Sequence, residues 1–385
     1  MSSSRTAQTL HKKIPLAMPI LDEEMKEAAI QALQNERFVG GESVHKFEEE
    51  FARYCGTRYA VSTASGTAAL VLSLISQGVR GSQVMTSPAS FVASANSIIH
   101  AGATPRFVDI TLDDYTISPA KVRGSMNDVT KAIVPVHLFG FPARMDELTE
   151  IASKRGIAII EDACQAHGAS YNGKKAGSMG DAGCFSFFPS KNMTVGGDGG
   201  MVVTDNESIA QSVISLRDCG RAEGSKYLHD IVGFTERLNT VQAAIGRVQL
   251  KHLDAWNEKR KQVAYKYNEL LSDVKELITP PEGNTLVNPV YHMYVVRCEQ
   301  RDNLKAWLDQ AGVETGIHYP APIHLQPIYK KTYGYIGGEF PNSETLSKGA
   351  LSIPMHPGLT TDEVKHVSES IHEFYARKNR TSPVR

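Results

Sequence analysis

The fold is decided by a stretch in the middle of the chain, Gly156-Ile157-Ala158-Ile159-Ile160-Glu161-Asp162-Ala163-Cys164-Gln165-Ala166-His167-Gly168. The apolar run 157–160 is continuous, which is typical of a parallel strand covered on both faces. Asp162 follows at the carboxyl end of this strand, where open α/β sheets bind their ligands. The same aspartate could instead cap a following helix, so this stretch alone leaves both roles open.

The neighbouring segments continue an alternation of strands and helices. Residues 131–139 predict a strand, and residues 145–154 predict a helix before the 157–160 strand. This order predicts an α/β fold with a mostly parallel sheet. Farther along, Asn239 begins a capping-box pattern, and apolar residues at helical spacing continue to about Leu271. The sequence therefore predicts a long helix there.

A second apolar strand runs directly into a lysine, in Cys184-Phe185-Ser186-Phe187-Phe188-Pro189-Ser190-Lys191-Asn192. A lysine at the mouth of a hydrophobic strand loses its proton readily, because burial disfavours the ammonium form. A neutral amine is the form that Schiff-base chemistry requires. Most lysines after strands are solvated surface residues, so Lys191 becomes a strong candidate only together with the other motifs.

A third segment, residues 60–74, passes from a short strand through Ser65-Gly66-Thr67 into a helix rich in alanine and leucine. Free backbone N–H groups and the helix dipole make such a helix start a phosphate-binding site. An ordinary serine or threonine cap is the alternative. The segment has neither the Walker A pattern nor a convincing dinucleotide fingerprint.

Together, a phosphate cradle, a carboxylate and a lysine match the needs of pyridoxal 5′-phosphate. The lysine would form a Schiff base with this cofactor, and the acid would pair with its pyridinium nitrogen. The sequence at 65–70, 161–168, 186–192 and 197–201 resembles the DegT/StrS-type nucleotide-sugar aminotransferases. The resemblance extends from about Ile14 to about Tyr375, and its motifs are jointly very specific.

This resemblance implies a fold type I architecture, as in aspartate aminotransferase. We expect a three-layer α/β sandwich with a mostly parallel sheet, followed by a smaller α/β domain at the carboxyl terminus. The expected divisions are a flexible arm at 1–13, a large cofactor-binding domain at 14–250 and a small domain at 251–385. The long helix beginning near Asn239 would join the two domains.

The resemblance also assigns roles to individual residues. Lys191 is expected to be catalytic, as the cofactor-binding lysine and as a proton shuttle, and lysine at this position favours transamination over dehydration. The other expected contacts with the cofactor are the pyridinium nitrogen (Asp162), the phenolic oxygen (Gln165), the ring face (Phe91) and the phosphate (Gly66, Thr67, Ser186 and, more weakly, Ser65). An ordinary core phenylalanine is the alternative for Phe91.

One motif departs from the family pattern. Many relatives carry Gly-x-Asn-x-Arg before the long helix, and their asparagine reaches the phosphate from the partner subunit. This chain has Thr235 in place of that asparagine, and a threonine hydroxyl can still donate a hydrogen bond with a shorter reach. Arg237 would face the nucleotide sugar or form a structural ion pair. The implied assembly is a homodimer with shared active sites.

A proline-rich loop near the carboxyl terminus, residues 315–327, is expected to contact the substrate. Its candidates are His318, Tyr319 and His324, and buried histidines in a rigid loop are the alternative. The loop looks most like that of relatives that aminate C3 of a 3-keto sugar. The expected reaction moves an amino group, with L-glutamate as the expected donor, onto C3 of a nucleotide-linked keto sugar.

Composition agrees with such an enzyme. The 385 residues are 41% hydrophobic and 22% charged, with a formal net charge of −1, which gives no signal for nucleic acid or membrane partners. The five cysteines are scattered, which suggests reduced thiols and a cytoplasmic location. Neither Cys-x-x-Cys nor His-Glu-x-x-His occurs, so no metal site is expected.

Three alternatives stay open at this point. One is amination at C4, as in a perosamine-type aminotransferase. Another is an amino-acid lyase on the same fold. The third is a non-catalytic regulator that has kept the fold. The nucleotide and the sugar are not fixed by the sequence.

Overall fold

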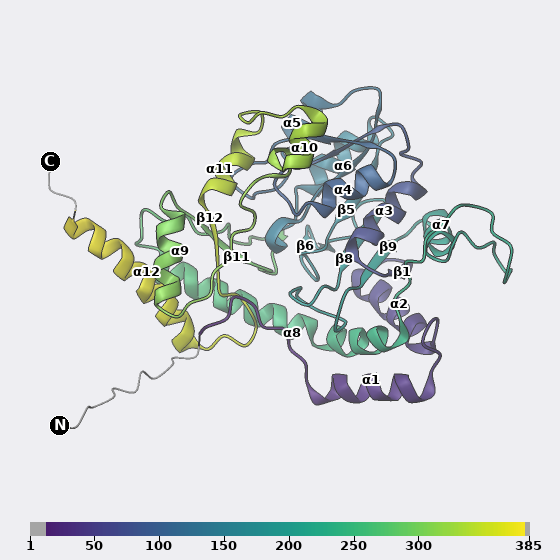
Figure 1. Cartoon of the computed structure of the whole chain (residues 1–385), viewed down its shortest axis with the longest axis horizontal. Coiled ribbons are helices and arrows are strands. Elements are labelled where there is room, and N and C mark those ends of the chain that lie inside the picture. The colour runs from purple at the N-terminus through teal and green to yellow at the C-terminus, as the bar shows by residue number, and fades with distance from the viewer. Residues whose placement is uncertain (1–12, 382–385) are drawn as a thin grey trace.

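A computed structural model describes the backbone of residues 13–381 and the side chains as far as residue 377. Nearly all of the expected flexible arm lies outside these residues. The centre of the molecule is a seven-stranded sheet whose strands are parallel except β9 (Figure 1). In spatial order the strands are β1 (Tyr59–Thr63), β9 (Gly200–Thr204), β8 (Ala182–Ser186), β5 (Ala158–Asp162), β4 (Thr130–Val134), β2 (Gln83–Thr86) and β3 (Thr104–Phe107).

Helices cover both faces of this sheet because the strands are apolar on both faces. Side chains alternate along a strand, so Ile160 and Ile159 of β5 enter different core clusters. The Ile160 face is covered by α3 (Gly66–Ser76), α4 (Ala93–His100) and α7 (Glu207–Arg217). The Ile159 face is covered by α2 (Glu42–Cys55), α5 (Pro119–Ser125), α6 (Met145–Ser153) and the start of α8 (Thr240–Leu271). The expected three-layer α/β sandwich with a mostly parallel sheet is confirmed.

The elements expected from the sequence are present, and one of them is shorter than expected. The strand expected at 131–139 is β4, which ends at Val134, and residues 138–140 form a 3₁₀ turn instead. The helix expected at 145–154 is α6. The decisive apolar run is β5, which extends two residues farther than its apolar part and includes Asp162. The long helix is α8, and its cap is the expected one, because the Asn239 side chain accepts a hydrogen bond from the backbone N–H of Gln242.

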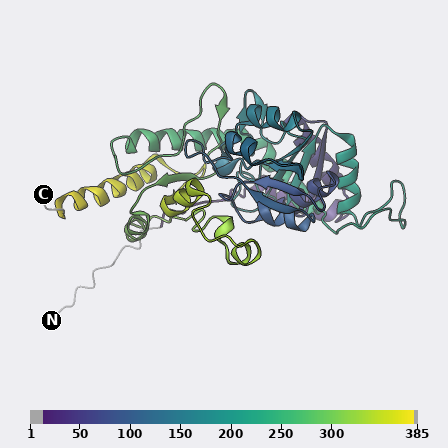
Figure 2. The same ribbon diagram turned by 90° about the horizontal axis from the view of Figure 1, so that it is seen from above.

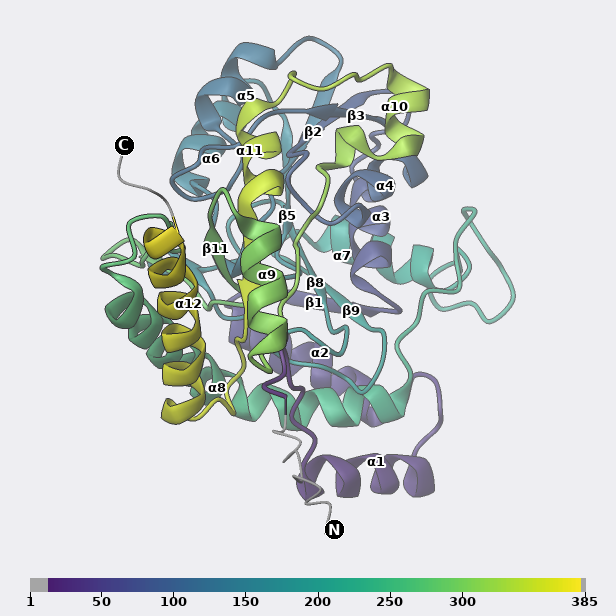
Figure 3. The same ribbon diagram turned by 60° about the vertical axis from the view of Figure 1, so that its left-hand side comes forward.

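A smaller unit follows around the antiparallel pair β11 (Tyr294–Arg297) and β12 (Ala350–Ile353), packed with α9 (Arg301–Gln310) and α12 (Thr361–Thr381). The second half of α8, including Tyr267, belongs to the same core, and Figure 2 shows α12 running beside it. Ile14 also packs in this core and pairs with Val313. The described part of the chain therefore begins against the small unit, and α1 (Glu23–Asn35) then packs along α8 (Figure 3). The domain limits near 14 and 250 stay a prediction.

The remaining elements are short. The 3₁₀ turns η1 (Leu138–Gly140) and η2 (Ile323–Leu325), with α10 (Pro327–Tyr333) and α11 (Pro341–Gly349), lie near β3 and β11. A small sheet contains β10 (Val287–Asn288), β6 (Ser170–Tyr171) and β7 (Lys174–Lys175). In the part of the chain that is described, no helix has the length and apolar character needed to cross a bilayer.

One segment projects away from this body. Residues 218–237 leave the end of α7 and return before α8, held by bridges that pair Asp218 with Thr235 and Arg221 with His229 (Figure 1). It carries exposed apolar side chains: Tyr227 is 79% and Val232 is 93% accessible. We call residues 218–237 the projecting segment.

Candidate active site

A cavity of about 470 Å³ lies at the carboxyl ends of β5 and β8, where parallel sheets bind ligands. It brings together most of the residues singled out from the sequence. The predicted site residues that line it are Ser65, Gly66, Thr67, Phe91, Asp162, Gln165, Ser186, Lys191, His318 and Tyr319. Thr235, Arg237 and His324 do not line it.

Lys191 lies in a turn just beyond β8, and its backbone N–H donates to the carbonyl of Phe188 at 2.9 Å. Burial lowers the pKa of its amine, although Cys164 and Asp162 act in the opposite direction. Desolvation dominates, as expected for a lysine at the mouth of an apolar strand. The amine is therefore shifted toward the neutral, nucleophilic form.

Asp162 is a buried carboxylate, 5% accessible, that faces the same cavity. It accepts hydrogen bonds from the Ser94 hydroxyl at 2.7 Å and from the Cys164 N–H at 3.2 Å. No helix follows it, so the helix-cap alternative is wrong. Among the described residues it has no ion-pair partner within salt-bridge distance. A buried carboxylate without a cationic partner is unfavourable, so Asp162 favours a ligand that places a positively charged group beside it.

The start of α3 forms the expected cradle. The Ser65 hydroxyl accepts from the Ala68 N–H at 3.1 Å, so Ser65 is indeed a helix cap. The N–H groups of Gly66 and Thr67 have no acceptor within the described part of the chain, and they are available to an anion. A Cβ at Gly66 would lie 2.6 Å from the Cβ of Ser186, so only glycine lets the helix start approach β8 this closely.

Three further residues form one wall of the cavity. The Gln165 side chain accepts from the Phe139 N–H at 2.7 Å and donates to the Tyr319 hydroxyl at 3.2 Å. The Phe91 and Tyr319 rings lie 5.9 Å apart. Phe91 is 55% accessible, so it is not an ordinary core phenylalanine and its ring is available to stack on a ligand.

These observations test whether pyridoxal 5′-phosphate suits the cavity. The unpaired N–H groups at the start of α3 can bind a phosphate, and the buried Asp162 carboxylate can pair with a protonated pyridine nitrogen. The Lys191 amine, whose pKa is lowered by burial, can react with an aldehyde carbon. The exposed face of Phe91 suits an aromatic ring. The residues present therefore fit this cofactor.

Thr235 and Arg237 lie in the projecting segment, outside the cavity. The Arg237 guanidinium donates to the Asp218 carboxylate at 2.5 Å, which is the ion pair that the sequence left open as an alternative. Thr235 is exposed, and its hydroxyl lies 3.4 Å from the Cys219 sulfur. Neither residue lines the cavity of the one chain that the structure describes.

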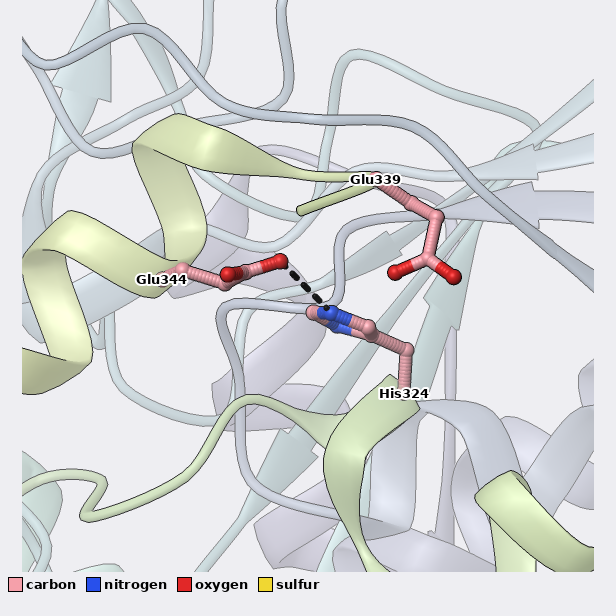
Figure 4. A group of neighbouring side chains, drawn as sticks. All are labelled: His324, Glu339 and Glu344. Atoms are coloured by element: carbon pink, nitrogen blue, oxygen red, sulfur yellow. Dashed lines mark hydrogen bonds and ion pairs between the residues drawn. The ribbon is translucent and has the colours of Figure 1, made fainter. Parts of the chain in front are cut away.

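The structure does not bring His324 to the cavity. Its ring is fully buried, its centroid lies 4.7 Å from that of Phe340, and its Nε2 is 3.2 Å from a Glu344 oxygen (Figure 4). Glu339 completes a trio whose ligand atoms all lie within 4.8 Å of one another. Both carboxylates already accept backbone N–H groups, from Gly338 to Glu344 and from Gly337 to Glu339. The trio therefore braces the loop before α11, which explains why His324 turns away from the substrate side.

Other residues of the cavity were not expected from the sequence. Ser94 contacts Asp162, and His292 enters from the segment before β11. Cys164 lies under the start of α3, where a Cβ at Gly66 would meet its sulfur at 2.8 Å. Ser94 and His292 lie outside the motifs that pointed to the cofactor, so only their place in the fold reveals them.

The fold and the cavity define a transferase built around a strand-end lysine. Residues 19–372 match the model of the DegT/DnrJ/EryC1/StrS aminotransferase family, and the chain belongs to this family. The expected family is thus confirmed, and the reading as a regulator without catalytic activity is set aside.

Two relatives and one solved structure illustrate the similarity. A "Pleiotropic regulatory protein" of Geobacillus stearothermophilus is 40% identical over 94% of this chain and 95% of its own. A dTDP-3-amino-3,4,6-trideoxy-alpha-D-glucose transaminase of Streptomyces venezuelae is 36% identical over 98% of both chains. The crystal structure of S. venezuelae DesV in complex with a ketimine intermediate superimposes with a TM-score of 0.90, at 36% identity over 94% of this chain and 99% of that one.

Proposed function

We propose that this protein is a pyridoxal-phosphate-dependent aminotransferase that moves an amino group from L-glutamate onto a nucleotide-linked keto sugar. The observation that carries the proposal is the placement of Lys191, with its lowered amine pKa, in one cavity with the buried Asp162 and the free N–H groups at the start of α3. The family match and the transaminase among the relatives support it.

When bound, the cofactor supplies an electron sink for the carbon that loses or gains the amino group. Lys191 would bind it covalently and, once released, would move a proton to and from that carbon as a neutral amine. The Asp162 carboxylate would hold a proton on the pyridine nitrogen. The N–H groups of Gly66 and Thr67, with the hydroxyl of Ser186, would hold the phosphate, and the positive end of the α3 dipole would add to their attraction.

The sugar is proposed to enter beside His318 and Tyr319. The Nδ1 of His318 lies 2.8 Å from the Ser352 hydroxyl of β12, which fixes the ring orientation. Burial lowers the pKa of His318, and Lys191 lowers it further, so the imidazole is neutral near pH 7. A neutral, fixed imidazole can hydrogen-bond a sugar hydroxyl without attracting the phosphates of the nucleotide.

Amination at C3 rests on the 315–327 loop and on the 3-amino sugar named for the Streptomyces relative. The loop sets how deep the sugar lies in the cavity. It thereby decides which sugar carbonyl comes within ~3–3.5 Å of the cofactor amine, the distance needed for attack. Amination at C4 is the alternative. The test is single-turnover spectroscopy of the aminated holoenzyme with 3-keto and 4-keto nucleotide sugars in parallel. Amino transfer to the 4-keto sugar alone would reject C3 and leave the aminotransferase activity standing.

We expect His318→Ala to weaken use of the keto sugar by about tenfold, while the half-reaction with L-glutamate changes less than about twofold. The reason is that His318 lies on the proposed sugar side of the cavity and not beside the phosphate cradle. The two half-reactions, measured separately by stopped flow, check this. Equal losses in both would mean that His318 supports the cavity rather than the sugar.

The active unit is proposed to be a homodimer with shared sites in the cytoplasm. The projecting segment carries several exposed apolar side chains, among them Tyr227, Leu228 and Val232, which favours a partner surface against it. A twofold dimer would bring Thr235 and Arg237 of one subunit toward the cavity of the other.

Subunit complementation tests this arrangement. We expect Lys191→Ala and Arg237→Ala to be weakly active alone and to regain up to about a quarter of wild-type activity when their subunits are mixed, because one composite site of a heterodimer is then intact. The measurement is activity after subunit exchange, with exchange confirmed by two affinity tags. Complete exchange without regained activity would place each site within one chain.

A further inference from the structure

The turn after β4, residues 137–143, is closed by the side chain of its first residue, His137. The ring is fully buried, and its Nδ1 accepts a hydrogen bond from the Ala143 N–H at 3.0 Å. A ring nitrogen that accepts a hydrogen bond bears no proton, so the proton of this ring is on Nε2. Nε2 lies 2.8 Å from a carboxylate oxygen of Glu161 and donates to it. His137 therefore ties the two ends of the turn together and fastens them to β5.

Glu161 is a fixed anchor for this ring. Its side chain is fully buried and also accepts three backbone N–H groups, from Gly177 at 2.7 Å and from Met179 and Gly180 at 2.6 Å. Together with the contact from His137, each carboxylate oxygen then has two donors. A carboxylate held by four donors keeps one orientation, so the ring bonded to it is held as well.

The turn held in this way places one backbone donor at the wall of the cavity. Phe139 has a φ of 58°, a left-handed conformation that is unfavourable for a residue other than glycine. In this conformation its N–H donates to Oε1 of Gln165 at 2.7 Å. The amide oxygen of Gln165 therefore faces the turn, and its NH₂ group donates to the Tyr319 hydroxyl at 3.2 Å. Loss of the Phe139 contact would let the amide turn over and present its oxygen instead.

The direction of this amide decides what the wall offers to a ligand. The Tyr319 oxygen accepts from Gln165, so the proton of its own hydroxyl is available to another acceptor. Burial raises the pKa of this phenol, which keeps its proton in place near pH 7. The second N–H of the Gln165 amide is also a donor. The wall therefore suits an oxygen that bears negative charge, such as the phenolic oxygen of pyridoxal 5′-phosphate.

We propose that His137 is a positioning residue that acts on the bound cofactor through Gln165. By joining Ala143 to Glu161, the ring keeps the Phe139 N–H on the amide oxygen of Gln165, and the amide then donates to the phenolic oxygen. This role rests on the proposed function of the same site. Neither His137 nor Glu161 lines the cavity, so the reaction would depend on two buried residues that do not touch the reacting groups.

The cofactor-free protein tests whether His137 holds the turn. Amide hydrogen exchange of peptides that contain residues 138–143 is followed by mass spectrometry in wild type, His137→Asn and His137→Phe. Phenylalanine cannot accept from Ala143, so the amides of Phe139 and Ala143 should exchange at least about tenfold faster in His137→Phe. Asparagine carries its oxygen near the position of Nδ1 and should restore most of the protection. Equal exchange in all three proteins overturns the role of His137.

The absorption of the bound cofactor tests the action through Gln165. A donor on the phenolic oxygen favours the state in which the neighbouring Schiff base has lost its proton, because the negative charge of that oxygen is then uncompensated. Loss of the donor in Gln165→Leu should therefore raise the pH midpoint of the visible absorption change by at least about half a unit. His137→Phe should raise it in the same direction, and the double variant should show no further increase. Shifts that add in the double variant overturn the coupling.

A matched variant separates this effect from a general loss of stability. His324 is also fully buried beside a glutamate, Glu344, but it does not line the cavity. His324→Phe should lower the thermal midpoint of unfolding, as His137→Phe does, without moving the absorption midpoint. Equal absorption shifts in both variants would reduce His137 to a support of the fold. Failure of the wild type to bind the cofactor would reject the proposed function, whereas an unchanged absorption midpoint in cofactor-loaded His137→Phe rejects only the role of His137.

Discussion

Lys191→Ala is expected to reduce transamination by at least about 10³-fold, because it removes both the covalent attachment and the proton shuttle. The fold should survive. Burial lowers the pKa of this amine, which means that the folded protein holds an ammonium there at a cost. Removing the amine removes that cost, so the thermal midpoint of the cofactor-free variant should not fall. Steady-state assays and thermal unfolding of the cofactor-free proteins check both statements.

The same experiment identifies the lysine chemically. Borohydride reduction of the holoenzyme should fix the cofactor to the peptide that contains Lys191, and the variant should give no such peptide. Lys154→Ala is a suitable control, since Lys154 is an exposed lysine paired with Glu150 on α6 and lies outside the cavity. A cofactor adduct on another lysine would remove Lys191 from the centre of the proposal.

Four of the predicted site residues that line the cavity share one property. Asp162, Ser186 and Lys191 lie at or just beyond the carboxyl end of a buried strand, and Gly66 opens a helix directly after another strand. In a parallel sheet all such ends meet at one edge, so local patterns are enough to bring these residues together. The order of the elements and the apolar runs are therefore enough to predict that these residues meet, whereas the distances between them come from the structure.

The residues that the sequence did not place depend on partners far along the chain. His324 is turned away by Glu344, and Ser94 matters only because α4 brings it against Asp162. His292 contacts Asn192, whose amide donates to Asn257 on α8, and no motif marks Asn257. Arg237 finds Asp218 across the projecting segment. Such contacts follow from packing between elements, and no periodicity of a single segment encodes them.

Asp162→Asn is expected to leave the cofactor bound and to slow transamination by at least about tenfold, a barrier increase of ~1.4 kcal/mol. An amide has nearly the shape of the carboxylate and can still accept from the Cys164 N–H, so the cavity should keep its form. It bears no charge, however, and cannot stabilise a proton on the pyridine nitrogen. The electron sink is then weakened in the step where the substrate carbon loses its proton.

The measurement for Asp162→Asn is the rate constant of the L-glutamate half-reaction, together with cofactor affinity by fluorescence titration. An exposed surface carboxylate provides the matched control, and Asp128→Asn should react at the wild-type rate. The loss should appear in the deprotonation step, so substrate deuterated at the α carbon should show a larger isotope effect in the variant than in wild type. A wild-type rate in Asp162→Asn would reduce Asp162 to a residue that only organises the turn between β5 and Cys164, because the charge would then have no part in the chemistry.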